Sequence, residues 1–160
     1  MFRIGIGQDM HRLVAGRPLI LGGVSIAFDL GAEGHSDSDA LAHALIDALS
    51  GAMCDGDIGT HFPDSSPKWK DADSFDMLAH VVKRVEARGF HVVNTDATIM
   101  LERPKLREYI GSMRVNLARA LNVDVDCVSV KAKTGEGLDA VGRGEAVSAQ
   151  AIVLLSNENT

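Results

Sequence analysis

The sequence predicts an α+β fold, an α/β sandwich in which helices pack on one face of a single mixed β-sheet. Segments whose apolar residues alternate, as in strands, interleave along the chain with segments whose apolar residues recur at helical spacing. With 160 residues, 46% of them hydrophobic, the chain is long enough to bury one core and short for two. We therefore expect a single domain spanning residues 1–160.

The N-terminal strand is predicted by apolar residues at every second position from Phe2 to Ile6. We expect this strand to stop at Gly7. Asp9 and His11 would then lie on the loop beyond it, where functional groups are commonly displayed.

The first helix is predicted after residues 36–39, where Ser and Asp side chains alternate as possible N-caps. Apolar residues recur with helical spacing from Leu41 onward and should face the core. His43 lies off this apolar stripe and shares a helix face with Asp39 and Asp47.

The same periodicities place the other elements. We expect short strands at 19–21 and 24–26 around a glycine turn, loops at 29–34 and 55–71, a helix at 73–88, a strand at 90–101, a helix from Pro104 to Asn122, a strand at 127–132, a loop at 133–144 and a last strand at 145–155.

The charge balance argues against a protein that holds nucleic acid through phosphate contacts, because 16 basic and 22 acidic residues give a net charge of −6. Cys54 and Cys127 are too few for a disulfide framework or a Cys-rich zinc site. We see no signal peptide and no run of about 20 apolar residues. We therefore expect a soluble, cytoplasmic protein with no membrane partner.

Asp9, His11 and His43 form the candidate metal site. Zinc takes His nitrogens and carboxylate oxygens, and catalytic sites supply three protein ligands while keeping a fourth position open. Asp47, one turn after His43, is expected to accept a hydrogen bond from its ring. Taken singly, either histidine is instead compatible with a hydrogen-bonded structural role.

His35 precedes the helix and would lie about 12 Å from His43 along the axis of a regular helix, too far to share one ion. We assign His35 and Ser36 to the substrate, because free backbone N–H groups at a helix start favour a phosphate. The alternative is that His35 belongs to the helix cap.

Two glycine-rich loops carry polar residues whose role the residues alone leave open. Acidic side chains between Asp55 and Asp64 suit sugar hydroxyls or a hard metal, but equally suit simple turns. In the last loop, Glu136 is a candidate magnesium ligand, since Mg²⁺ prefers one or two carboxylates with phosphate oxygens. The alternative is that these are solvated loop residues.

Taken in order, these motifs resemble those of the 2-C-methyl-D-erythritol 2,4-cyclodiphosphate synthase family, on the methylerythritol phosphate route to isoprenoids. The resemblance runs from residue 3 to about 153. It rests on Arg-Ile-Gly-Ile-Gly-Gln-Asp-Met-His at 3–11, Gly-Gly-Val at 22–24, His-Ser-Asp-Ser-Asp at 35–39 with His43, Gly-Asp-Ile-Gly at 56–59, Phe-Pro-Asp at 62–64, Pro-Lys at 104–105, Val-Lys-Ala-Lys-Thr at 130–134 and Gly-Arg-Gly-Glu at 142–145.

The resemblance implies a phosphorus–oxygen lyase that cyclises 4-diphosphocytidyl-2-C-methyl-D-erythritol 2-phosphate to 2-C-methyl-D-erythritol 2,4-cyclodiphosphate and releases CMP. It implies a homotrimer whose active sites lie between subunits, with strands lining the trimer interior. It also implies Zn²⁺, or another divalent transition metal, at Asp9, His11 and His43, and Mg²⁺ or Mn²⁺ bridging the substrate phosphates.

The resemblance further assigns residues to parts of the substrate. His35 and Thr134 would position the phosphates, and Glu136 would help to hold magnesium. The methylerythritol end would be bound by Asp57, Ile58, Gly59, Phe62 and Asp64. The cytidine pocket, on the adjoining subunit, would be formed by Leu101, Pro104, Lys105, Leu106, Ala132 and Lys133. Arg143 matches the arginine with which members hold an isoprenyl diphosphate at the end of the trimer, although Ala140 stands there at an aromatic position.

Two other functions remain compatible with the residues. A zinc-dependent phosphoester hydrolase also needs three ligands and an open position for water. A trimeric metal-binding or scaffolding protein would use the same ligands without turnover.

Overall fold

The computed structural model describes residues 1–63, 65–66, 69 and 71–158. A five-stranded sheet has the order β4-β1-β7-β5-β6, and a two-stranded sheet pairs β2 with β3. β5 and β6 are parallel, whereas the other neighbours in the large sheet are antiparallel. The strands are β1 Phe2–Ala15, β2 Leu19–Leu21, β3 Val24–Ile26, β4 Leu30–Ala32, β5 His91–Met100, β6 Val128–Lys133 and β7 Ala146–Ser156.

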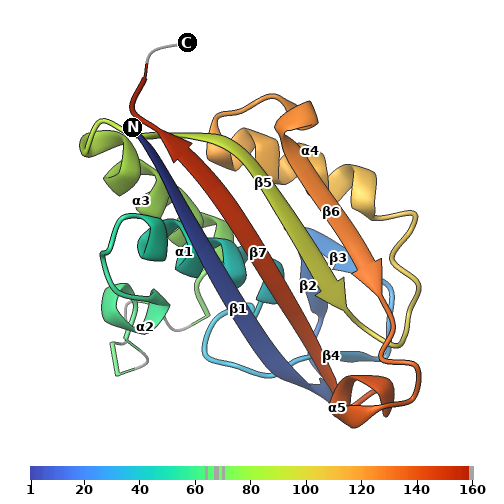
Figure 1. Ribbon diagram of the computed structural model, residues 1–160. Coiled ribbons are helices and arrows are strands. Elements are labelled where there is room, and N and C mark those ends of the chain that lie inside the picture. The colour runs from blue at the N-terminus through green and yellow to red at the C-terminus, as the bar shows by residue number, and fades with distance from the viewer. Residues whose placement is uncertain (64, 67–68, 70, 159–160) are drawn as a thin grey trace.

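The three longer helices lie together behind the large sheet (Figure 1). This arrangement confirms the α+β class, the mixed sheet and the packing of helices on one face. The helices are α1 Ala40–Ala52, α2 Ile58–His61, α3 Ser74–Ala87, α4 Ile110–Leu121 and α5 Asp139–Gly142, with a 3₁₀ turn at Val125–Cys127. None of the helices in the described part of the chain has the length and apolar character needed to cross a membrane.

The prediction that the first strand stops at Gly7 was wrong, since β1 continues to Ala15 and pairs with β7 as far as Arg12. The glycines allow close packing of α1 instead of ending the strand. A Cβ on Gly5 would lie 1.9 Å from the Ala48 carbonyl oxygen, and one on Gly7 would lie 2.0 Å from that of Ala44. As a result, Asp9 and His11 project from a paired strand that is rigidly placed against α1.

Asp39 is the N-cap of α1 and also anchors the glycine turn between β2 and β3. Its buried carboxylate accepts the N–H groups of Leu41 and Ala42 in the helix and those of Gly22 and Gly23 in the turn. Local and tertiary contacts therefore fix the same helix start, one turn before His43.

Four other expectations were wrong in detail. The loop at 29–34 contains β4, which pairs with the end of β1, and the loops at 55–71 and 133–144 contain α2 and α5. α4 begins at Ile110 and not at Pro104, although it ends at Asn122 as expected, and Asn122 adopts the left-handed conformation. β4, α2 and α5 have only three or four residues each, too few to show a period in the sequence, and β4 forms because it pairs with β1.

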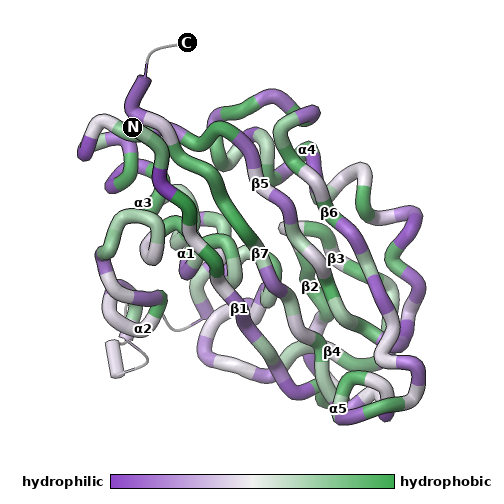
Figure 2. The backbone as a smooth tube through the Cα atoms, viewed as in Figure 1, coloured by the Kyte–Doolittle hydropathy of each residue, from purple (hydrophilic) through white to green (hydrophobic). Residues whose placement is uncertain are grey.

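The large sheet has one covered and one open face. Exposed residues alternate with buried ones along β1 and in the middle of β7, and successive strand side chains point to opposite faces, so the exposed ones lie on the face away from α1. Figure 2 shows hydrophobic stretches along both strands. Phe2 is 60% exposed, Ile4 71%, Ile6 61% and Met10 54%. A monomeric protein rarely leaves such a patch in water, so this face has the character of an interface.

Candidate active site

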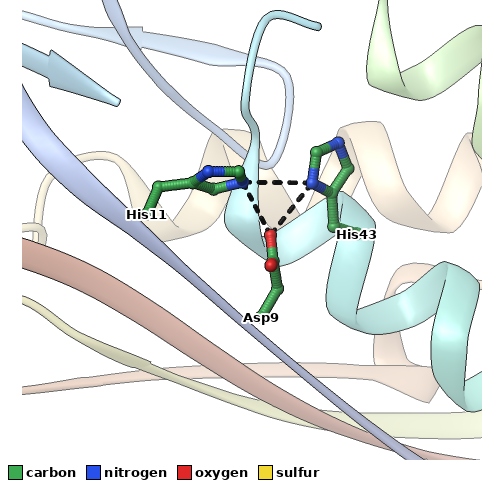
Figure 3. A group of neighbouring side chains, drawn as sticks. All are labelled: Asp9, His11 and His43. Carbon is green, nitrogen blue, oxygen red and sulfur yellow. Dashed lines mark hydrogen bonds and ion pairs between the residues drawn. The ribbon is translucent and has the colours of Figure 1, made fainter. Parts of the chain in front are cut away.

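Asp9, His11 and His43 point toward one centre, as Figure 3 shows. The Asp9 Oδ2 atom lies 2.8 Å from His11 Nε2 and 2.9 Å from His43 Nδ1. The two ring nitrogens are 3.2 Å apart. β1 supplies two of these side chains and α1 the third, so the packing of α1 on Gly5 and Gly7 sets the geometry of the cluster.

The outer nitrogen of each ring is held by a hydrogen-bond partner. His11 Nδ1 lies 2.8 Å from the Glu33 carbonyl oxygen, which only accepts, so this nitrogen carries a proton, and in the neutral ring Nε2 has the lone pair that a metal needs. His43 Nε2 lies 2.8 Å from Ser74 Oγ. Such outer partners fix the orientation of metal-binding histidines.

The electrostatics of the cluster also suit a cation. Burial opposes ionisation of the Asp9 carboxyl, but its interactions with the neighbouring His11 and His43 rings outweigh burial and hold its pKa well below the usual range. Burial likewise opposes protonation of His11, but Asp9 raises the pKa of that ring above its usual value. The Asp9 carboxylate therefore stays ionised beside two imidazoles, and this set of groups is typical of the ligands of a divalent metal.

The predicted hydrogen bond between Asp47 and His43 is absent from the described contacts, and this prediction was wrong. The Asp47 carboxylate instead accepts the N–H of Ile58 at 2.7 Å and so fixes the start of α2. Burial raises the pKa of Asp47. The partner of His43 is Ser74, which sequence reasoning missed, because a contact across 31 residues leaves no local pattern.

A cavity of about 250 Å³ opens beside the cluster. Its polar side contains the three candidate ligands with His35 and Ser36, and its other side is apolar and aromatic. The residues that line it are Asp9, His11, Gly34, His35, Ser36, His43, Ile58, Gly59, Phe62, Trp69 and Met77. Five residues that we assigned to substrate therefore lie at the cluster, and sequence reasoning missed Trp69 and Met77.

The structure does not place the other two residues assigned to the methylerythritol end, Asp57 and Asp64, at this cavity. Asp57 is the N-cap of α2 and accepts both the N–H and the hydroxyl of Thr60, at 2.8 and 2.7 Å. It is not among the residues that line this cavity. Asp64 lies outside the described residues.

A second cavity of about 410 Å³ lies where β5 and β6 end, near the start of α4. All six residues assigned to the cytidine pocket line it, together with Thr134. Sequence reasoning missed Arg107 and Ile110. The lining residues are Leu101, Pro104, Lys105, Leu106, Arg107, Ile110, Ala132, Lys133 and Thr134.

Thr134 and Glu136 face each other at the rim of this pocket, where the Thr134 hydroxyl donates to the Glu136 carboxylate. Glu136 is exposed, so its oxygens are accessible to a cation. Arg143 forms an ion pair with Glu145 at 3.0 Å, and this ion pair raises the pKa of the guanidinium. Arg143 is not one of the described residues that line the two cavities.

Residues 2–156 match the sequence profile of the YgbB family. The chain belongs to this family. A relative of this YgbB chain, the 2-C-methyl-D-erythritol 2,4-cyclodiphosphate synthase of Salinibacter ruber, is 59% identical over 149 residues, which are 93% of this chain and 95% of the relative. These findings confirm the resemblance on which the sequence interpretation rested.

Two solved structures share the fold of this YgbB chain. A 2C-methyl-D-erythritol-2,4-cyclodiphosphate synthase in a form bound to CDP matches with a TM-score of 0.90 and 42% identity, over 96% of this chain and all of the other. The bifunctional IspDF of Campylobacter jejuni matches with a TM-score of 0.93 and 39% identity. The match covers 97% of this chain but 42% of that longer protein.

Proposed function

We propose that this chain cyclises 4-diphosphocytidyl-2-C-methyl-D-erythritol 2-phosphate to 2-C-methyl-D-erythritol 2,4-cyclodiphosphate and releases CMP. The observation that carries this proposal is the convergence of Asp9, His11 and His43 at the wall of a cavity, in a chain 59% identical to a cyclodiphosphate synthase. The CDP-bound relative supports a cytidine nucleotide as the leaving part of the substrate.

In this reaction the 2-phosphate of the substrate attacks the β-phosphorus of its own diphosphate. Because the attacking oxygen is tethered to the phosphorus that it attacks, the protein needs to supply position and charge stabilisation and not a nucleophile. A divalent cation at Asp9, His11 and His43 would neutralise charge on the phosphate oxygens. We propose Zn²⁺ for this cluster, since two imidazoles and a carboxylate are typical zinc ligands.

Residues outside the cluster are proposed to orient the substrate phosphates, hold the second metal and bind the nucleotide. His35 lines the metal cavity and is proposed to orient a phosphate there. Thr134 would orient the diphosphate, and the exposed Glu136 carboxylate beside it would help to hold Mg²⁺ or Mn²⁺. Lys105 and Lys133 are exposed at the apolar pocket, where they would meet the nucleotide phosphates.

The active form is proposed to be a homotrimer with the open sheet face inside. The exposed side chains of Phe2, Ile4 and Ile6 on β1 support an interface on this face. The metal cavity and the nucleotide pocket share no lining residue, and β7 and β5 separate β1 from β6 in the sheet. We propose that each active site combines the metal cavity of one subunit with the pocket of the next.

Incubation of the purified protein with the cytidylyl substrate and Mg²⁺ tests the function. We expect the cyclic diphosphate and CMP in equal amounts, measured by ³¹P NMR and chromatography. A ring-opened phosphate product would indicate a hydrolase, and no turnover by the metal-loaded trimer would indicate a binding or scaffolding protein. Either of these results would contradict the proposal.

A further inference from the structure

The segment that leads into α3 is bonded directly to the segment that leads into α1. The Asp71 N–H donates to the His35 carbonyl at 2.9 Å, and the Asp37 N–H donates to the Ala72 carbonyl at 3.2 Å. The Ser74 N–H donates to Asp37 Oδ2 at 3.2 Å. Residues 35–37 and 71–74 therefore form one unit at the wall of the metal cavity.

Within this unit, the Ser74 hydroxyl lies between a carboxylate and a candidate metal ligand. It donates to Asp37 Oδ1, and its oxygen lies 2.8 Å from His43 Nε2. A carboxylate only accepts, and a hydroxyl has only one proton to give. If that proton goes to Asp37, the Ser74 oxygen must accept a hydrogen bond from His43 Nε2–H.

This direction decides which nitrogen of His43 is free. A neutral imidazole carries one N–H, so a proton on Nε2 leaves a lone pair on Nδ1. Nδ1 is the atom that faces Asp9 and His11. Ser74 is 0% exposed and His43 is 7% exposed, so water has little access to replace this bond.

A competing arrangement exists at the same place. Asp9 Oδ2 lies 2.9 Å from His43 Nδ1, close enough to accept a hydrogen bond if the proton moved to Nδ1. That tautomer would close the metal site with an internal hydrogen bond. Ser36 Oγ also approaches His43 Nε2, but at 3.2 Å it is the more distant of the two hydroxyls.

We propose that Ser74 and Asp37 are positioning residues that hold His43 in the tautomer whose Nδ1 binds metal. They do not touch the metal, and they act through the His43 ring. The inference rests on the metal site of the proposed function. Under this proposal, Ser74, at the start of α3, controls how strongly His43 on α1 binds the metal.

Ser74→Ala tests the proposal in the metal-free protein and with Zn²⁺ as the probe. Loss of such an outer partner weakens metal binding by about 10- to 100-fold, and we expect this loss in competition with a chromophoric chelator. The matched control is Ser50→Ala, which removes another buried hydroxyl, one without a hydrogen-bond partner in the described part of the chain, and should leave Zn²⁺ affinity unchanged.

A spectroscopic measurement separates tautomer control from a general loss of structure. In long-range ¹H–¹⁵N spectra of the metal-free protein, we expect His43 to be protonated at Nε2 in the wild type. In Ser74→Ala we expect the proton to shift toward Nδ1. Ser50→Ala should keep the wild-type pattern.

Asp37→Asn provides an isosteric second variant. The Ser74 N–H still needs an acceptor at the position of Oδ2, so the amide oxygen should take that position and the amide NH2 should face the Ser74 hydroxyl. The hydroxyl would then donate to His43 Nε2, which drives the ring proton to Nδ1. We expect Zn²⁺ affinity to fall by about 10- to 100-fold here as well. Unchanged affinity with an unchanged tautomer in both variants would overturn the proposal.

These experiments also distinguish an error in the metal-site assignment from an error in the tautomer proposal. If the wild type does not bind Zn²⁺, the metal site of the proposed function is wrong, and the tautomer of metal-free His43 still decides the present inference. Protonation at Nε2 that is lost in Ser74→Ala would support it. Protonation at Nδ1 in the wild type would overturn it.

Discussion

The metal cluster and the pocket at residues 101–107 and 132–134 differ in how much of their surroundings one chain provides. The cluster is interlocked: its three ligand atoms lie 2.8 to 3.2 Å apart, and both rings have an outer partner. The pocket has a buried apolar wall at Leu101 and Leu106, whereas its lysines remain exposed at the rim.

This difference follows from what each region has to bind. A small cation needs ligands placed to within a fraction of an ångström, which requires a paired strand, a capped helix and fixed ring tautomers. A nucleotide is larger and is held by an apolar surface with a few polar contacts. All three candidate ligands of the first region come from one chain, whereas under the proposed function the second region is open toward a neighbouring copy.

The largest expected effect comes from removing a ligand. His43→Ala should lower Zn²⁺ affinity by more than about 100-fold, because even the loss of a partner outside the ligand set costs about 10- to 100-fold. Turnover of the cytidylyl substrate should fall to background. The affinity for CMP, measured by calorimetry, should be nearly unchanged, since His43 does not line the pocket and CMP lacks the second phosphate.

Lys133→Ala is the matched variant for the other region. It should retain a full Zn²⁺ content while binding CMP more weakly. A His43→Ala protein that still carries stoichiometric zinc would contradict the assignment of this ligand.

Subunit mixing tests whether the two regions meet across an interface. Asp9→Ala and Lys133→Ala should each be nearly inactive alone. Mixed trimers should regain part of the wild-type activity, because some sites then combine an intact cluster from one subunit with an intact pocket from the next. Mass spectrometry verifies the mixed trimers, and continued inactivity in them would place both regions of one active site in the same chain.

A smaller effect is expected at Asp55, which holds the loop after α1 to α3. Its carboxylate accepts hydrogen bonds from Arg84 at 2.7 Å and from Arg88 at 2.6 Å. The Arg84 hydrogen bond, followed by that of Arg88, holds the pKa of Asp55 below its usual 3.8. Asp55→Asn should lower the free energy of unfolding by about 1 kcal/mol, because water screens these exposed arginines.

The lowered pKa of Asp55 also predicts how its contribution to stability changes with pH. A lowered pKa in the folded state stabilises the fold above the ordinary pKa, and this contribution is lost as the pH falls through the folded value. The difference between wild type and Asp55→Asn in urea unfolding should therefore be full at neutral pH and shrink below about pH 4. Zn²⁺ affinity should not change, and a parallel loss of metal would mean that this loop also shapes the cluster.

Parts of this molecule were predictable because their signals are local. α1 follows from an Asp cap at position 39 and an apolar stripe, and α3 from Asp73 and a second stripe. The three candidate metal ligands could also be chosen from the sequence, since few residue types bind zinc. The residues of the nucleotide pocket came from the family resemblance, and the structure shows that they share one cavity.

Other parts depended on contacts between distant segments. In a sequence, a glycine can either end a strand or let a helix pack closely against it. The structure shows the second role for Gly5 and Gly7, because a Cβ on either would collide with the backbone of α1. β4 exists because it pairs with the end of β1. The nearest acidic residue on the same helix face, Asp47, was the natural partner for His43, but α2 takes that carboxylate.

The sequence by itself therefore determined the set of candidate ligands, the helix that carries His43 and the family to which the chain belongs. Only the tertiary structure decided that Asp9 and His11 project from a paired strand and that Ser74 holds the His43 ring. The physical reason is the distance along the chain over which each kind of interaction acts. Capping and helical periodicity act within one or two turns, whereas strand pairing, close packing on glycine and the hydrogen bonds around a buried histidine join residues far apart in the chain.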